Sequence, residues 1–223
     1  KNVDISGCNE MHICGKESCM ISALPNAAKA IEYVFNDGID HVTGKRLGLA
    51  TGDAAKMESF EEFYAAFQKQ FAYILDTVMD AARRYEKHVA ETNPSVLLSA
   101  AVESSLAKGV DAYAFGFKYT TSCLMLCSFA TTVDSILAVK ELVFEKKAAT
   151  LAEFKDALQH NWEGYENLRR LALNARDKYG NANKQADLYA AALFRWFSVY
   201  VTGQKNSRGG VYKVGVPSTL HFI

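Results

Sequence analysis

Two side chains that could act together on one substrate lie near the start of the chain, Cys8 and Glu10. They belong to a polar segment, residues 4–23, that is rich in Gly and Ser and has little periodicity, so we expect a structured loop there. In an extended loop, side chains two residues apart point to the same side, and one substrate would then contact both the thiol and the carboxyl. The alternative is structural, with the cysteine as a small buried apolar residue and the glutamate as a solvated charge.

A metal site is the first rival interpretation of this segment. Cys8, His12, Cys14 and Cys19 lie within twelve residues and could form a zinc or iron–sulfur knuckle. The segment contains no Cys-x-x-Cys pair, and its spacings match neither zinc clusters nor ferredoxin patterns. We therefore predict no metal in this chain.

Two further alternatives are a cysteine–histidine hydrolase and a non-catalytic helical interaction domain. None of the five histidines has a context that marks it as the partner of a nucleophile; they are His12, His41, His88, His160 and His221. The helical stripes described below are all that favours an interaction domain, and composition leaves that alternative open.

Composition indicates a globular chain with a sizeable core. Of 223 residues, 49% are hydrophobic and 22% charged, and the 25 basic and 25 acidic residues balance, which argues against nucleic-acid and anionic-membrane partners. No apolar run approaches the roughly 20 residues of a membrane helix, and no signal peptide precedes residue 8. Five cysteines, an odd number, favour reduced thiols in a cytoplasmic protein, with Cys123 and Cys127 in the core. The missing initial Met and the final apolar run, residues 216–223, suggest a fragment.

Periodicity predicts a mostly helical chain with a few short strands, folded as one domain. Capping boxes are predicted at Ser59/Glu62 and at Thr150/Glu153, each opening a helix. The expected helices cover 25–37, a long stretch from 59 with its aromatic stripe in the core, 94–109, 132–144, a stretch from 150, and 186–200. The expected strands lie within 112–126 and 211–223, the latter being a strand or a barrel loop.

Several segments, in order, resemble the central-to-late part of glycyl radical enzymes. The first is Ser6-Gly7-Cys8-Asn9-Glu10, which resembles the Gly-Cys-Val-Glu loop of the eliminating members. The others are residues 35–40 with 43–45, 59–62 with 67–70, 130–135 with 138–140, 161–165, 178–181 and Arg208-Gly209-Gly210. No single segment is specific, but their common order over nearly the whole chain indicates membership of this family.

The resemblance implies a ten-stranded α/β barrel built from two half-barrels, with the cysteine on a loop tip inside it. Residues 1–223 would form a single helix-rich piece of that barrel domain. The N-terminal half-barrel is missing, and so is the C-terminal radical motif, Arg-Val-x-Gly-aromatic, which occurs nowhere in the chain. We expect this piece by itself to be inactive.

The resemblance also implies roles for the two residues. Cys8 becomes a thiyl radical by giving its hydrogen to a glycyl radical on a glycine outside this chain, which a radical S-adenosylmethionine activating enzyme installs. The thiyl then removes a hydrogen atom from a small polar substrate. Glu10, its pKa raised by burial in an apolar barrel, serves as acid or base during elimination.

The type of reaction follows from the residue after the cysteine. Formate acetyltransferases of the family carry two adjacent cysteines, whereas Asn9 follows Cys8 here, so we expect a dehydratase or a carbon–nitrogen or carbon–sulfur lyase. An arylacetate-type decarboxylase is the alternative, and Asn9 departs from the usual Val. Thr219 and His221 fall where the family places a barrel strand and could face substrate, although a purely structural strand role is the simpler interpretation. Family members are commonly homodimers.

Overall fold

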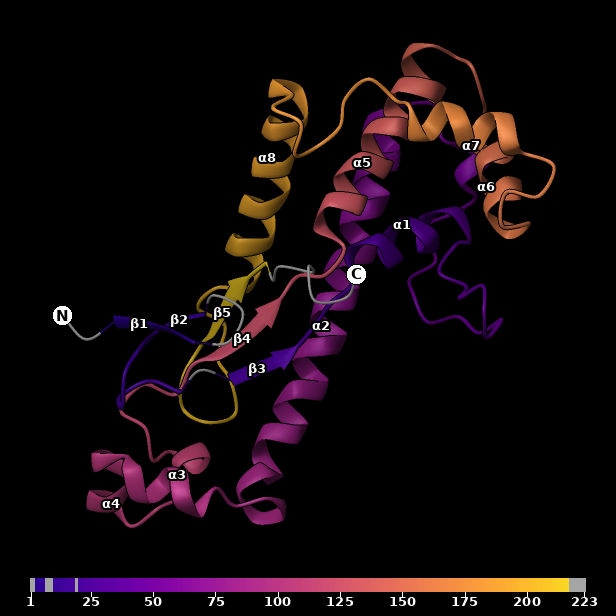
Figure 1. Cartoon of the computed structure of the whole chain (residues 1–223). Coiled ribbons are helices and arrows are strands. Elements are labelled where there is room, and N and C mark those ends of the chain that lie inside the picture. Colours follow the sequence, from indigo (N-terminus) through magenta and orange to yellow (C-terminus); the bar gives the residue numbers. More distant parts are fainter. Residues whose placement is uncertain (1–2, 7–9, 19, 217–223) are drawn as a thin grey trace. The chain divides into compact units, whose positions relative to one another are not determined.

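The computed structural model describes residues 3–6, 10–18 and 20–216. The chain divides into two compact units, which share helices α2 and α8 (Figure 1). The sheet unit comprises Lys1–Pro25, Leu75–Cys127 and Phe197–Ile223, and the helical unit comprises Asn26–Ile74 and Ser128–Trp196.

The described residues of the sheet unit form five short strands in two sheets. They are β1 Val3–Ser6, β2 Glu10–Ile13, β3 Met20–Ala23, β4 Ser122–Met125 and β5 Tyr212–Gly215. β1 and β2 form an antiparallel hairpin, and β4 lies between β3 and β5 in a parallel sheet (Figure 1). Parallel neighbours require long crossover connections, and here helices supply them.

The prediction of a loop over residues 4–23 is wrong in part, because this segment holds three of the five strands. Their four-residue lengths and polar composition give no clear apolar alternation. Backbone pairing makes them strands instead: Val3 is in register with Ile13 and Ser6 with Glu10. The predicted strand within 112–126 is confirmed as β4, and the described part of 211–223 forms β5.

Three helical segments pack in the sheet unit besides the second half of α2 (Phe60–Thr92) and the end of α8 (Lys184–Val201). They are α3 Val96–Ala101, α4 Glu103–Lys108 and the 3₁₀ turn η2 Ala112–Ala114. The single helix predicted over 94–109 is therefore two helices, because Val102 is extended and buried against Ala112. Gly109, in the left-handed conformation, ends the second helix as predicted.

The helical unit is built on α1, the first half of α2 and α5. Its other segments surround a core of aromatic side chains, with Phe35 between Phe63 and Phe154 at ring separations of 5.6 and 6.4 Å. The elements are α1 Ala27–Phe35, η1 Ala54–Lys56, α5 Phe129–Val139, the π-helical η3 Lys140–Glu145, α6 Leu151–Gln159 and α7 Glu166–Leu173. Phe63, Phe67 and Phe71 are fully buried, which confirms the predicted stripe on α2.

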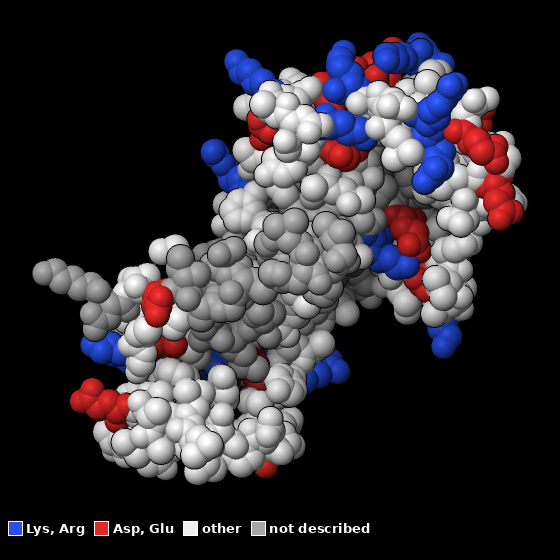
Figure 2. Space-filling model, viewed as in Figure 1, with Lys and Arg blue, Asp and Glu red and all other residues white. Residues whose placement is uncertain are grey.

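Polar side chains fix the helix ends and one loop of the helical unit. The capping box at Thr150 and Glu153 is confirmed in full, whereas Ser59 accepts from the Glu62 amide and Glu62 turns to the Glu58 amide instead. Gln70, fully buried, bonds both main-chain groups of Leu49 and thereby holds the loop that follows α1. Acidic and basic side chains occur together over the α5–α7 region (Figure 2), in keeping with the balanced charge of the chain. Among helices of the described residues, none has the length and hydrophobicity of a membrane span.

Candidate active site at the β1–β2 hairpin

Of the predicted catalytic pair, the structure places the backbone of Glu10 at the end of the β1–β2 hairpin. Glu10 opens β2, and its backbone pairs with Ser6 at the end of β1, so this last pair brackets Cys8 in the sequence. For Glu10 the structure describes the backbone, and Cys8, Thr219 and His221 lie outside the described residues. The two substrate-facing candidates near residue 220 therefore stay predictions.

The opposite end of the hairpin is fixed by Glu17. The chain turns after β2, with the amides of Lys16 and Glu17 donating to the Ile13 carbonyl at 3.0 and 2.9 Å. The Glu17 carboxylate completes the turn, since its Oε2 accepts from the Ile13 amide at 3.2 Å. Ile13 is the last residue of β2, and both of its main-chain polar groups are thus held by the turn.

The same carboxylate also contacts the parallel sheet. Glu17 Oε1 accepts from Thr121 Oγ1 at 3.0 Å and forms an ion pair with Lys213 of β5. Glu17 is 6% exposed. Burial raises the pKa of its carboxyl, but the hydrogen bonds from Lys213, Thr121 and the Ile13 amide outweigh burial and set the pKa below its ordinary value.

Main-chain hydrogen bonds continue this attachment toward β4. The Ser18 amide donates to the Tyr119 carbonyl, and the Tyr119 amide donates to the Lys16 carbonyl, both at 2.9 Å. Ser18 Oγ donates to the Thr121 carbonyl at 3.0 Å. The segment after the hairpin therefore runs beside the segment that enters β4.

A buried polar cluster holds the strands to the loop before β5. Glu86, on α2, accepts from Ser22 of β3 at 3.0 Å and from the Ser207 amide at 3.1 Å, and it also binds Ser122 of β4. Arg208 donates to the Thr121 carbonyl at 2.7 Å and to Ser122 Oγ at 3.1 Å. Four residues therefore supply hydrogen-bonding groups to two charged side chains that water scarcely reaches.

Arg208 and Glu86 are close without a direct hydrogen bond. Arg208 Nε lies 3.9 Å from Glu86 Oε1, and this nitrogen has no hydrogen-bond partner within the described part of the chain. Burial lowers the pKa of the guanidinium, while the Glu86 carboxylate opposes that shift. Arg208 is part of the Arg-Gly-Gly segment of the family resemblance, and in the structure it connects the loop before β5 to Thr121 and Ser122.

The thiols that the structure describes form no disulfide and are spread over the sheet unit. Cys14 is exposed and donates to Asp4 at 3.6 Å; residual burial and this contact raise the pKa of its thiol. Cys123 and Cys127, predicted as core thiols, are only half-buried. The described residues include no group of three or more metal-binding side chains. The His12 ring carries a buried Nδ1 that lacks a hydrogen-bond partner among them.

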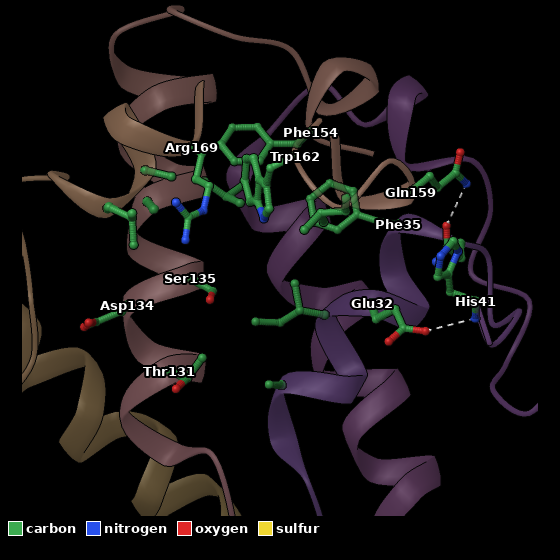
Figure 3. Close-up of a pocket in the computed structure, with 18 of the residues that line it drawn as sticks. Glu32, Phe35, His41, Thr131, Asp134, Ser135, Phe154, Gln159, Trp162 and Arg169 are labelled. Atoms are coloured by element: carbon green, nitrogen blue, oxygen red, sulfur yellow. Dashed lines mark hydrogen bonds between the residues drawn. The ribbon is translucent and has the colours of Figure 1, made fainter. Parts of the chain in front are cut away.

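A cavity with a volume of about 600 Å³ lies in the helical unit between α1, α5, α6 and α7. Figure 3 shows Phe35, Phe154 and Trp162 grouped on one side, while Thr131 and Ser135 line it from α5. Neither predicted catalytic residue belongs to its lining.

The acidic groups of this cavity already have structural partners. Glu32 binds Lys29 at 2.8 Å and accepts from the His41 amide at 3.0 Å (Figure 3), and Asp134 accepts from the Tyr179 amide at 2.8 Å. These contacts give both carboxylates a structural role in joining the helices and loops of this unit.

Sequence reasoning missed Glu17, Glu86 and Lys213. A lone glutamate in a polar segment is typical of a solvated charge, and the partner of Glu17 lies 196 residues away. The only available signal is the position of Glu17 four residues after the end of β2, which becomes visible once the hairpin is known.

Comparison with known proteins agrees with this assignment of the fold. Residues 1–221 match the family described as "Pyruvate formate lyase-like". The chain therefore belongs to this family of glycyl radical enzymes, as its motifs predicted, and its strands and helices form part of the α/β barrel of that family.

The similar proteins include two curated dehydratases. The chain is 34% identical to trans-4-hydroxy-L-proline dehydratase of Clostridioides difficile, over 97% of this chain and 28% of that protein. It is 32% identical to (2S)-3-sulfopropanediol dehydratase of Klebsiella oxytoca, over 96% of this chain and 26% of that protein. The crystal structure of the former with trans-4-hydroxy-L-proline bound matches with a TM-score of 0.88 at 33% identity, covering 98% of this chain and 28% of that chain. The chain thus spans about 28% of the length of these relatives.

Proposed function

We propose that this chain is the thiyl-bearing piece of a radical lyase that eliminates a leaving group from a small polar substrate, with Cys8 as the thiyl site and Glu10 as the acid–base group. The observation that carries the proposal is the family match across residues 1–221, which includes the Gly-Cys-x-Glu segment. Two dehydratases among the relatives support elimination over acyl transfer. Residues 1–223 then form one piece of the barrel domain.

The chemistry assigned to these residues balances in atoms and electrons. A glycyl radical, on a glycine outside this chain and installed by a radical S-adenosylmethionine enzyme, supplies the unpaired electron. Cys8 gives up its thiol hydrogen, and its sulfur then takes a hydrogen atom from a substrate carbon. Glu10 accepts the proton of the hydroxyl or amine beside the radical carbon and passes it to the leaving group, which departs with its electron pair. The product radical then takes a hydrogen atom back from Cys8, and Cys8 regains one from the glycine, which restores the starting radical.

The remaining assignments follow from the same proposal. The substrate is a small polar molecule, with Thr219 and His221 as candidate contacts, and the native protein works in the cytoplasm as a homodimer. Asn9, in place of a second cysteine, favours water, amine or sulfite as the leaving group rather than transfer to coenzyme A.

The first test compares Cys8→Ala and Glu10→Gln with the unaltered native protein after activation. The substrates are trans-4-hydroxy-L-proline and (2S)-3-sulfopropanediol, and the products are followed by mass spectrometry. We expect no turnover for Cys8→Ala and a loss of about 10²-fold or more for Glu10→Gln. Cys14→Ala, which removes an exposed thiol of the same segment, is the control and should keep its activity. Turnover in Cys8→Ala would disprove the proposal.

A further inference from the structure

Building on the proposed function, we infer that Glu17 and Lys213 form a clamp that ties the end of β2 to the parallel sheet and thereby positions the backbone of the segment that contains the proposed catalytic residues. Glu17 is a positioning residue in this proposal, because it acts on the backbone that carries Cys8 and Glu10. The clamp consists of one carboxylate, the Ile13 amide, the Thr121 hydroxyl and the Lys213 ammonium.

The clamp contacts the hairpin at the last residue of β2. Glu17 Oε2 holds the Ile13 amide at 3.2 Å, at the end of β2 opposite Glu10. β2 is one continuous strand from Glu10 to Ile13, so the two ends are separated by about 10 Å at roughly 3.3 Å per residue. A tilt at Ile13 is therefore transmitted along the strand to the residues that carry the chemistry.

On the parallel sheet, the clamp contacts Thr121 and Lys213. Thr121 directly precedes β4, and Lys213 is paired in register with Cys123 of β4. One carboxylate thus connects the hairpin base to two neighbouring strands of the parallel sheet. The attachment point at β4 is itself held in place, because Glu86 and Arg208 both bind Ser122 of β4 and Arg208 also binds the Thr121 carbonyl.

The negative charge of Glu17 is needed for its ion pair with Lys213. Glu17 is 6% exposed, and a buried carboxylate is retained only with several partners. Glu17→Gln keeps the size of the side chain and one acceptor oxygen but loses the ion pair with Lys213. The end of the hairpin at Ile13 should therefore become more mobile while the protein stays folded. The main-chain bonds from Ser18 and Tyr119 remain in that variant.

Greater mobility of the hairpin in Glu17→Gln should lower kcat more than it lowers the stability of the fold. A misplacement of about 1 Å at a reacting group can cost about 10²-fold in rate. We expect Glu17→Gln to lower kcat 10- to 100-fold while KM changes less than threefold and the glycyl radical content, measured by electron paramagnetic resonance, stays at the level of the unaltered protein. Lys213→Gln should act in the same way, and the double variant should be no worse than Glu17→Gln alone.

A matched control is available in the helical unit. Glu141 is also buried, at 3% exposure, pairs with Lys146 and accepts a hydrogen bond from the Arg176 amide at 2.7 Å. Glu141→Gln therefore loses a similar ion pair away from the hairpin. It should lower Tm about as much as Glu17→Gln and leave kcat unchanged.

Hydrogen–deuterium exchange makes the test independent of turnover. Glu17→Gln in the native protein should raise the exchange rate of the amides of residues 10–13 at least tenfold, and Glu141→Gln should not. Unchanged exchange there would overturn the clamp, whatever the activity. Faster exchange with unchanged kcat would overturn the positioning role. Turnover that survives Cys8→Ala would instead overturn the proposed function, while exchange would still decide whether the clamp exists.

Discussion

At the scale of single residues, the sheet unit depends on two buried charged groups, Glu86 and Arg208, that are 4% and 1% exposed. Each is surrounded by hydroxyls and main-chain groups rather than by one ideal counter-ion. Such an arrangement adds little net stability, but it ties together strands that are distant in sequence, and removal of one member leaves the other unpaired. The cluster therefore specifies which strands adjoin.

Gly210 shows how closely the backbone approaches β4 in this cluster. Its amide donates to Asn206 Oδ1 at 2.8 Å, and a Cβ at this position would lie 1.9 Å from the Thr120 carbonyl oxygen. Because that obstacle is backbone, Gly210→Ala should destabilise the protein by about 3 kcal/mol. Urea unfolding followed by circular dichroism measures the loss. Gly44→Ala is the control: it meets no atom within 4 Å and should cost only about 1 kcal/mol for its left-handed conformation. Equal losses would contradict the steric explanation.

What the sequence predicts at this scale depends on the kind of signal. Cys8 and Glu10 are identified through a motif that resembles family members; Cys8 lies outside the described residues, and the structure describes Glu10 by its backbone. Glu17 has no such motif, and its role arises from partners at Thr121 and Lys213 that only the folded chain brings together. Inference from the neighbouring sequence alone therefore treats Glu17 as a solvated charge.

At the scale of elements, helix starts are set by short-range hydrogen bonds, and α6 gives the sharpest test. Thr150 Oγ1 accepts from the Glu153 amide at 3.1 Å, and the Thr150 amide donates to the Glu153 carboxylate at 2.7 Å. Thr150→Ala removes the first of these bonds and should cost about 1 kcal/mol, whereas Thr150→Ser should cost far less. Thermal unfolding of both variants checks this, and equal losses would show that the methyl group, not the cap, matters.

The helices were predictable because their signals are local, whereas some interruptions were not. An apolar stripe repeats about every four residues, and each helix cap, such as those at Thr150 and Gly109, involves residues only a few positions apart. The break between α3 and α4 depends on Val102 turning inward against Ala112, a tertiary contact. The π-helical turn over Lys140–Glu145 likewise continues α5 without a sequence signal that distinguishes it.

At the scale of the whole molecule, the parallel sheet explains why the strands resisted prediction. β3, β4 and β5 are four residues each and are separated by about a hundred residues, yet they are direct neighbours. The partner of each strand is chosen by packing and by the Glu86 and Arg208 cluster rather than by a local pattern. The resemblance to a barrel family supplied the topology that periodicity could not.

Charge balance over the whole chain makes its stability sensitive to acid. The 25 acidic residues offset 25 Lys and Arg near neutral pH, and their protonation leaves those cations and the five histidines uncompensated. Buried ion pairs add to this effect. Despite burial, hydrogen bonds from Lys213 to Glu17 and from Lys146 to Glu141 hold the pKa of both carboxyls below the ordinary value.

The sign of the pH dependence follows from these lowered pKa values. The unfolded chain binds protons at a higher pH than the folded one, so the stabilisation is complete above the ordinary glutamate pKa of about 4.3 and is lost as pH falls through it toward the folded pKa. We expect the urea midpoint to be constant from pH 7 to 5 and to fall steeply below about pH 4. Glu141→Gln, which cannot titrate, should have a lower midpoint at pH 7 and a shallower fall, so that the two curves converge in acid. Parallel curves would mean that the Glu141 pair contributes nothing to acid unfolding.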